Sequence, residues 1–178
     1  MYVSLNDDKI PVIKKIVSDL ERIVNVKILI DEKSKNIRVI PNSGNVYDTL
    51  KVINVIKAIN YGFKVEDAMK LLSDDYRLEV IDLKEFTRNQ EEMRRIKGRI
   101  IGEHGRTKKI IQQYTDVVIQ VGDNYIAILG SYDQVEVAKN AILMLMDGRQ
   151  HSTVYKYLDR AEIDLKEKKL DSIRRNIK

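Results

Sequence analysis

The most informative stretch of this chain reads Gly98-Arg99-Ile100-Ile101-Gly102-Glu103-His104-Gly105-Arg106-Thr107-Lys108-Lys109. At its centre is a Gly-x-x-Gly tetrad, and its two glycines allow a tight turn with positive φ, so that backbone N–H groups can face outward. A helix beginning near Arg106 would point its unpaired N–H groups and the positive end of its dipole the same way. We expect this loop to hold a sugar-phosphate backbone; an ordinary turn between two helices is the alternative.

The helices and strands expected around the tetrad favour a loop that holds a sugar-phosphate backbone over an ordinary turn. Hydrophobic periodicity predicts a strand at 79–82, helices at 94–101 and 107–114, and a third helix at 135–146. Strands at 117–121 and 125–129 form a hairpin across Gly122-Asp123-Asn124. The order is β-α-loop-α-β-β-α with the tetrad between the first two helices. It resembles the type I KH module, whose tetrad clamps about four unpaired nucleotides.

The composition indicates a folded, soluble chain. Of the 178 residues, 43% are hydrophobic and 33% are charged. This length is enough for one large domain or two small ones. No apolar run approaches the roughly 18 residues of a membrane helix, and the chain does not begin like a signal peptide, so we expect it in the cytosol and not at a membrane. Because there is no cysteine, disulfides, thiolate zinc sites and cysteine nucleophiles are excluded.

The distribution of charge is more informative than the net charge of +5. Residues 1–75 carry 12 Lys or Arg against 11 Asp or Glu, which is nearly neutral. Residues 94–109 instead carry seven basic side chains against Glu103 alone. An anionic partner is therefore expected at the tetrad rather than over the whole surface.

The first half repeats the second with one part missing. It is expected to run strand (2–5), helix (10–24), strands (26–30 and 36–40) and helices (47–61 and 65–72), with Asp7-Asp8 as an N-cap and Pro11 in the first turn. No glycine occurs before Gly44, so no tetrad interrupts the first helix. We interpret this half as a degenerate KH-like copy without the clamp, suited to packing or to docking a protein; an unrelated α+β domain is the alternative.

A long helix is expected after Gly148. Its apolar stripe contains Val154, Leu158, Ala161 and Leu165, and is continued less regularly by Leu170, Ile173 and Ile177. The near end should pack on the second module and the far end should project, either as a solvated helix or as a tail that docks a partner or touches RNA. The expected fold is thus α+β, with a KH-like module at 1–75, a KH module at 76–148 and a C-terminal extension at 149–178.

Several motifs narrow the KH class. These are Asn60-Tyr61-Gly62-Phe63, Leu78-Glu79-Val80, the tetrad with Arg106-Thr107-Lys108, Ile128-Leu129-Gly130-Ser131, and Val154-Tyr155. Together they resemble the Pno/Dim family of KH-domain ribosome-biogenesis factors, which partner the Nob endonuclease. The resemblance implies binding to the 3′-end region of small-subunit ribosomal RNA precursor and assistance to the nuclease that matures it. The chain departs from the family at Glu103 and His104, where lysine or glycine is common.

The RNA-binding residues follow from the loop. We expect the glycines to lie against the ribose-phosphate backbone, Arg106 and Lys108 to contact phosphates, and Thr107 to cap the next helix or donate to a phosphate. Lys97 and Arg99 should line the opposite wall, and Ile101 should floor the groove, whereas the other nearby isoleucines belong to the core. The predicted RNA-binding set is Lys97, Arg99, Ile101, Gly102, Glu103, His104, Gly105, Arg106, Thr107 and Lys108.

The sequence leaves two other function classes open, and in each we expect a monomer. The second class is an adaptor for a nuclease or a translation initiation factor, with incidental RNA contact. The third is an enzyme, which is disfavoured because the tetrad lacks the spacing of a P-loop and no catalytic constellation stands out. Two histidines and no cysteine predict neither a metal site nor a cofactor, and His151 receives no role.

Overall fold

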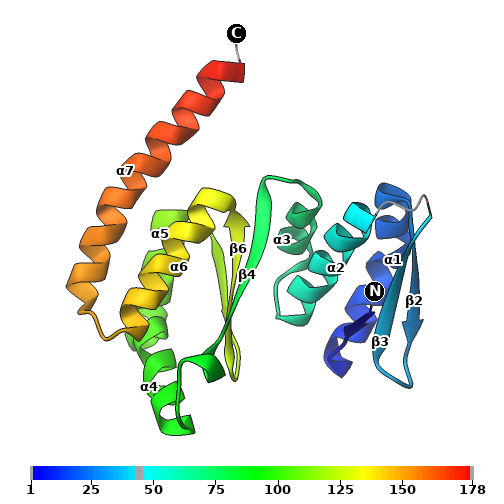
Figure 1. Cartoon of the computed structure of the whole chain (residues 1–178), viewed down its shortest axis with the longest axis horizontal. Helices are drawn as coiled ribbons and strands as arrows, with labels where there is room; N and C mark the ends of the chain where they lie inside the picture. The colour runs from blue at the N-terminus through cyan, green and yellow to red at the C-terminus, as the bar shows by residue number, and fades with distance from the viewer. Residues whose placement is uncertain (1, 43–45, 177–178) are drawn as a thin grey trace. The chain divides into compact units, whose positions relative to one another are not determined.

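The computed structural model describes residues 2–42 and 46–176 (Figure 1). Its contacts divide the chain into two compact units, Met1–Leu78 and Glu79–Lys178, each of which is described by itself below. Ile177, predicted to continue the C-terminal stripe, lies outside the described residues. Within them, no helix combines the length and the hydropathy needed to cross a membrane.

The first unit is a small α+β module. It contains β1 (Tyr2–Ser4), α1 (Ile10–Val24), β2 (Val26–Asp31), β3 (Asn36–Pro41) and α2 (Val46–Asn60), followed by α3 (Val65–Met69) and a 3-10 turn (Lys70–Leu72). The sheet has the order β1-β3-β2 and is antiparallel, with Val3 opposite Ile37 and Ile28 opposite Val39. These inward-facing side chains are buried together with residues of α1 and α2, so one apolar face of each element builds the core.

One local prediction in this unit is wrong. Asp7 and Asp8 do not cap α1, because they lie within a separate 3-10 turn, Asp7–Lys9, and Lys9 occupies the N-cap position of α1 without a side-chain hydrogen bond. Pro11 does lie in the first turn, as expected. The turn after β2 is closed by Asp31, whose carboxylate accepts from the Ser34 hydroxyl at 2.7 Å, a hydrogen bond that lowers the pKa of Asp31.

The second unit has the type I KH order. Strand β4 (Tyr76–Asp82) leads into α4 (Gln90–Ile101) and α5 (Arg106–Thr115), then β5 (Val118–Val121), β6 (Tyr125–Ser131) and α6 (Tyr132–Met146). The sheet order is β4-β6-β5, so the central strand is the last in sequence, as it is in the first unit. The α+β class and the predicted order of elements along the second unit are therefore confirmed, and the helix pair around the tetrad is present only in that unit.

Two helices begin earlier than their apolar periodicity indicated, because capping residues extend them. Asn89 accepts from the backbone N–H of Glu92 at 2.8 Å, and Glu92 accepts in return from the N–H of Arg88 at 2.9 Å, so α4 starts at Gln90. Ser131 and Gln134 form a reciprocal capping box that starts α6 at Tyr132. Capping thus adds a polar first turn ahead of each apolar stripe.

The C-terminal helix α7 (His151–Asn176) packs on the second unit through its first three turns. Val154 and Leu158 are fully buried, whereas Leu170 and Ile173 are 54% and 49% exposed. The Tyr114 hydroxyl donates to the Asp159 carboxylate, tying α5 to α7 and raising the pKa of Tyr114. In Figure 1 the far end of α7 extends past the other helices of this unit, as the stripe predicted.

Removing a buried contact of α7 should destabilise the second unit. Leu158→Ala is expected to lower its free energy of unfolding by about 2–5 kcal/mol, because a cavity replaces a fully buried side chain. Leu170→Ala is the matched control and should change stability by less than about 0.5 kcal/mol, since that side chain is exposed. Urea unfolding followed by circular dichroism measures both, and equal losses would contradict the docking described here.

Candidate nucleic-acid interface

The tetrad forms a short loop between α4 and α5. Gly102 has φ 74 and ψ 174, His104 has φ 50, and Gly105 has φ 76, so three of the four residues have positive φ. The Gly102 N–H donates to the Gly98 carbonyl at 2.9 Å and ends α4, and the Gly105 N–H donates to the Gly102 carbonyl at 3.2 Å. Helix α5 begins at Arg106 directly after the loop, so its positive end lies at the tetrad, as expected.

Thr107 explains why position 102 must be glycine. A Cβ at Gly102 would lie 2.7 Å from both the Cβ and the backbone nitrogen of Thr107, and closer still to its hydroxyl. Thr107 is only 3% exposed, and its Oγ1 lies 3.2 Å from the hydroxyl of Tyr155 on α7. Gly105, not Thr107, occupies the N-cap of α5, so the capping role predicted for Thr107 is wrong. Its side chain instead packs beneath the loop.

The two variable residues of the tetrad project into solvent. The side chains of Glu103 and His104 are 90% and 94% exposed, and His104 Nε2 lies 3.9 Å from Glu103 Oε1. The loop is therefore open to a ligand and is not covered by a neighbouring segment. A carboxylate at its tip lies on the path that a phosphate would take, so it opposes binding unless it turns away.

Lys97 and Arg99 are held by backbone carbonyls. Lys97 Nζ donates to the carbonyls of Asp123 at 2.9 Å and Gly122 at 3.3 Å, in the turn between β5 and β6. Arg99 Nε donates to the Leu145 carbonyl at 3.0 Å, near the C-terminus of α6, where the helix dipole favours a cation. Two residues of a helix that are separated by one position point to opposite sides. The structure therefore does not bring these two predicted residues together on one wall.

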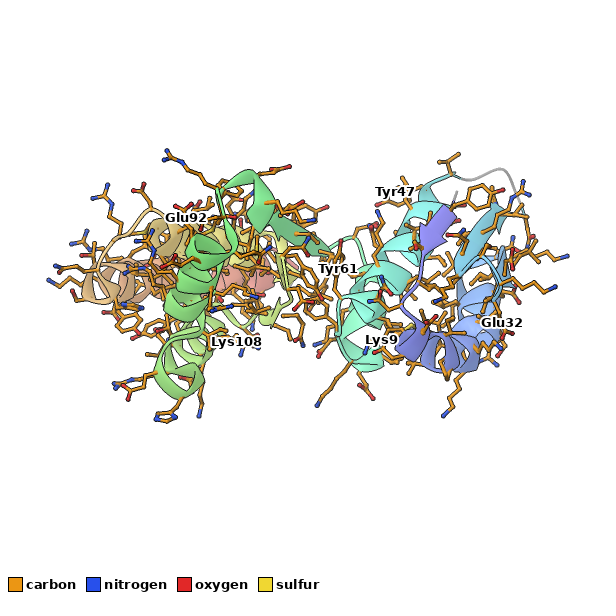
Figure 2. The ribbon with its side chains drawn as sticks, turned by 90° about the horizontal axis from the view of Figure 1, so that it is seen from below. Lys9, Glu32, Tyr47, Tyr61, Glu92 and Lys108 are labelled. Atoms are coloured by element: carbon orange, nitrogen blue, oxygen red, sulfur yellow. The ribbon has the colours of Figure 1, made fainter. Side chains whose placement is uncertain are left out.

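A surface depression beside the tetrad is lined by arginine side chains. This depression has a volume of about 580 Å³, and its walls include Arg95, Arg99 and Arg106. Gly98 and Gly102 lie at its edge, so no side chain fills the space there. Lys108, labelled in Figure 2, lies in the first turn of α5 and is partly exposed. Cations on α4 and α5 thus flank an exposed stretch of glycine backbone, an arrangement suited to a polyanion.

The nearby isoleucines follow the prediction in part, because Ile110, expected in the core, is only partly buried. Ile100 and Ile111 are fully buried in the core, whereas Ile101 and Ile110 keep part of their surface. Ile101 precedes Gly102 at the end of α4, and it is not among the residues that line the depression beside the tetrad. Ile101 is partly exposed, so its predicted role in the floor of the RNA groove stays a prediction.

Two residues of α7 were missed by sequence reasoning. His151 Nε2 lies 3.0 Å from the carbonyl oxygen of Arg99, and Tyr155 contacts Thr107 under the loop. Their rings are tilted by 60° with centroids 6.2 Å apart, and both residues line the depression beside the tetrad. The one signal for them in the sequence was the Val154-Tyr155 motif. It contributed to the family resemblance but did not indicate that Tyr155 lies beside the tetrad. Within the described residues, no group of three His, Cys, Asp or Glu could hold a metal ion.

Comparison with known families and curated proteins gives a consistent result. The family described as "Eukaryotic type KH-domain (KH-domain type I)" matches residues 77–163. The KH domain-containing protein MJ0443 of Methanocaldococcus jannaschii is 39% identical over 65% of this chain and 51% of its own length. The pre-rRNA-processing protein PNO1 of Phaeosphaeria nodorum is 34% identical over 74% of this chain and 51% of its own length. The chain thus spans about half the length of these curated relatives.

Solved structures match nearly the whole chain. A protein of unknown function from Aeropyrum pernix has a TM-score of 0.87 and 34% identity over 99% of this chain and 97% of its own. Dim2p from Pyrococcus horikoshii has a TM-score of 0.79 and 31% identity, covering 90% and 98%. The a/eIF2alpha–aDim2p–rRNA complex from the same organism gives 0.80 and 31%, covering 92% and 94%. The expectation of a binding protein rather than an enzyme agrees with these relatives.

Alanine at the two glycines should have unequal effects. Gly102→Ala is expected to destabilise the second unit by more than the roughly 1–3 kcal/mol of its backbone strain, because its Cβ also overlaps Thr107. Gly105→Ala has free space around its Cβ and should cost only the roughly 1–2 kcal/mol of a left-handed conformation. Urea unfolding midpoints compare the two, and a larger loss at Gly105 would contradict the packing of Thr107.

Proposed function

Because this chain belongs to the PNO1/Dim2 family of KH-domain proteins, we propose that its tetrad binds single-stranded RNA from the 3′-end region of small-subunit ribosomal RNA precursor. In this role it would assist maturation of that RNA by a partner endonuclease, without breaking a bond itself. The single observation that carries the proposal is the exposed glycine loop at the start of α5, beside a depression lined by Arg95 and Arg106, with the partly exposed Lys108 in the first turn of that helix.

In the proposed mechanism, shape and charge act together. Positive φ at Gly102 and Gly105 lets the backbone approach a ribose-phosphate strand without a Cβ in the way. Arg106 and Lys108, in the first turn of α5, contact phosphates and add to the dipole of that helix. Arg99 and Lys97 contribute mainly through the field of their charges, since two donors of each are already used by backbone carbonyls.

The two exposed side chains at the tip set how tightly a strand is held. Glu103 repels phosphate, and His104 in its 94% exposed position can stack on a base or donate a ring N–H to a phosphate. Thr107 acts indirectly in this proposal, because its buried hydroxyl contacts Tyr155 and fixes the loop. Ile101 provides the apolar surface beneath the bases.

We also propose protein partners for the same chain. The Pyrococcus horikoshii relative has been crystallised with a/eIF2alpha and rRNA together, which favours a translation factor of that type as a partner here. The endonuclease partner rests on the family alone. The first unit, which has no glycine tetrad in its first helix, is the proposed docking module of a chain that acts in the cytosol as a monomer. An adaptor with incidental RNA contact remains the alternative.

A charge placed at the loop tip tests the clamp without disturbing the backbone. His104→Asp should weaken binding of a single-stranded RNA with the 3′-end sequence of small-subunit rRNA by about tenfold or more, because a second carboxylate faces the phosphates. His104→Asn is the matched control: both residues tolerate the left-handed φ of 50° at this position, and only one adds charge. Fluorescence anisotropy gives the dissociation constants. Equal affinities of the two variants for this RNA would contradict the proposal that the tetrad binds it.

The salt dependence of binding counts the phosphate contacts. Arg106→Ala and Lys108→Ala should each weaken RNA binding and reduce the slope of log K against log salt by about 0.7, the value for one contact to single-stranded nucleic acid. Lys169→Ala, which removes an exposed cation far along α7, is the control and should leave the slope unchanged. A slope that Arg106→Ala and Lys108→Ala do not alter would place the RNA elsewhere on the chain.

A further inference from the structure

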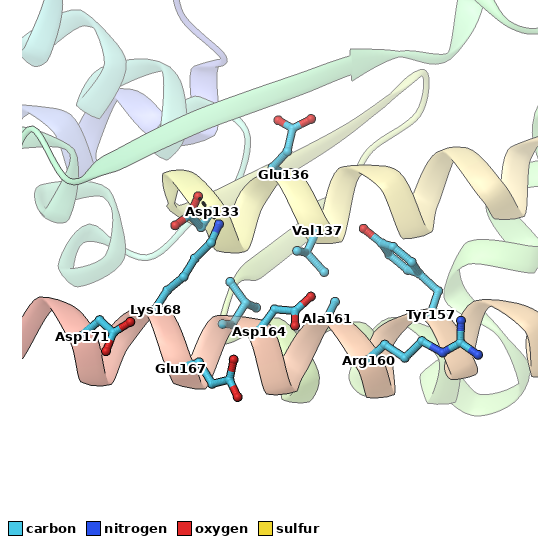
Figure 3. A pocket seen from close by; sticks show the side chains of 11 residues that line it. Asp133, Glu136, Val137, Tyr157, Arg160, Ala161, Asp164, Glu167, Lys168 and Asp171 are labelled. Carbon is cyan, nitrogen blue, oxygen red and sulfur yellow. Dashed lines mark ion pairs between the residues drawn. The ribbon is translucent and has the colours of Figure 1, made fainter.

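A second concavity lies on the second unit, between α6 and the middle of α7. It has a volume of about 510 Å³ and is distinct from the depression beside the tetrad, because the two share no residue. Figure 3 shows it as a groove that runs along both helices where they lie side by side. We call it the α6–α7 groove.

The charge of the α6–α7 groove is opposite to that of the tetrad. Arg160 and Lys168 are its only Lys or Arg residues, whereas five carboxylates line it: Asp133, Glu136, Asp164, Glu167 and Asp171. Lys168 lies 3.5 Å from Asp133 across the groove, and Asp171 lies 3.6 Å from Arg174. Asp164 and Glu167 form no ion pair within the described part of the chain. A groove of this charge repels RNA in a chain whose net charge is +5.

The floor of the groove is apolar. Val137 and Tyr157 are partly buried and pack against the core of the unit, and Ala161 is 9% exposed. Figure 3 shows Val137 and Ala161 facing each other between the charged rims. An apolar strip between carboxylates has the two properties that an amphipathic cationic helix matches, since its apolar side chains recur every three to four residues and its cations flank them.

We propose that the α6–α7 groove binds a cationic amphipathic helical segment of a protein partner. Apolar side chains of that segment contact Val137 and Ala161, and its Lys or Arg side chains pair with Asp164 and Glu167. Charge complementarity selects this occupant over RNA. A second copy of this chain is the competing occupant, because its own α7 carries Lys166, Lys168 and Lys169 beside Leu170, and the test below separates the two.

The test uses the full chain and a synthetic helical peptide of leucine, lysine and alanine with one leucine face. The matched probe replaces every lysine by glutamate. We expect the lysine peptide to bind and to shift amide NMR signals of α6 and the middle of α7, and the glutamate peptide not to bind. Binding of both peptides, or shifts confined to the tetrad or to the first unit, would overturn the proposal.

Charge variants of the groove make the assignment specific. Asp164→Asn with Glu167→Gln should weaken lysine-peptide binding by about tenfold, the effect of two lost charge pairs at a partly solvated rim. Asp19→Asn with Glu66→Gln makes the same change of net charge in the first unit and should leave the affinity unaltered. The swap Asp164→Lys with Glu167→Lys should reverse the preference, so that the glutamate peptide now binds.

Two further readouts decide between occupants. Sedimentation equilibrium should show the same mass for the unmodified chain and for the groove variants; a dimer that these variants dissociate would assign the groove to a second copy and overturn the proposal. RNA affinity should be equal in the unmodified chain and in the Asp164→Asn with Glu167→Gln variant, and a loss of RNA affinity in that variant would overturn the proposal as well. RNA binding is measured separately from peptide binding. A result that contradicts the groove proposal is therefore distinguishable from one that contradicts RNA binding by the tetrad.

Discussion

The close packing of Thr107 beneath Gly102 is the constraint on which the candidate RNA site depends. A side chain at position 102 has no room, since its Cβ would overlap Thr107, and Thr107 is in turn held by the hydroxyl of Tyr155 at 3.2 Å. Tyr155 belongs to a helix that is anchored by the buried Val154 and Leu158. The conformation of a four-residue loop is thereby coupled to a helix that begins about fifty residues later. Glycine gives the loop access to a ligand, and tertiary packing gives it one shape.

Tertiary contacts separate five of the seven cations of residues 94–109 into two groups. Lys97 and Arg99 donate to carbonyls at the β5–β6 turn and at the C-terminus of α6, where they satisfy acceptors that would otherwise require water. Arg95, Arg106 and Lys108 stay at the surface near the tetrad. The cluster of basic residues in the sequence therefore contributes only some of its side chains to the surface near the tetrad. Its structural members fix the position of α4, and Arg95 and Arg106 line the depression beside the loop.

The sequence predicted what depends on local pattern and missed what depends on distant partners. The order of helices and strands followed from periodicity, and the start of α5 followed from the glycines. The starts of α4 and α6 shifted because Asn89 and Ser131 cap a polar turn, a signal that apolar periodicity does not contain. The acceptors of Lys97 and Arg99, and the contacts of His151, lie 25 to 52 residues away, and no local rule pairs them.

Helix α7 carries two surfaces of opposite charge, and its geometry explains how both can persist. The depression beside the tetrad uses His151 and Tyr155, whereas the acidic groove is centred near Asp164. Nine residues of α-helix separate Tyr155 from Asp164 by about 13 Å, which exceeds the Debye length of roughly 8 Å at physiological ionic strength. Salt therefore screens each surface from the other. In the two proposals, one helix fixes the tetrad loop at its start and presents carboxylates further along, so that a polyanion at the tetrad and a polycation at the groove would not compete.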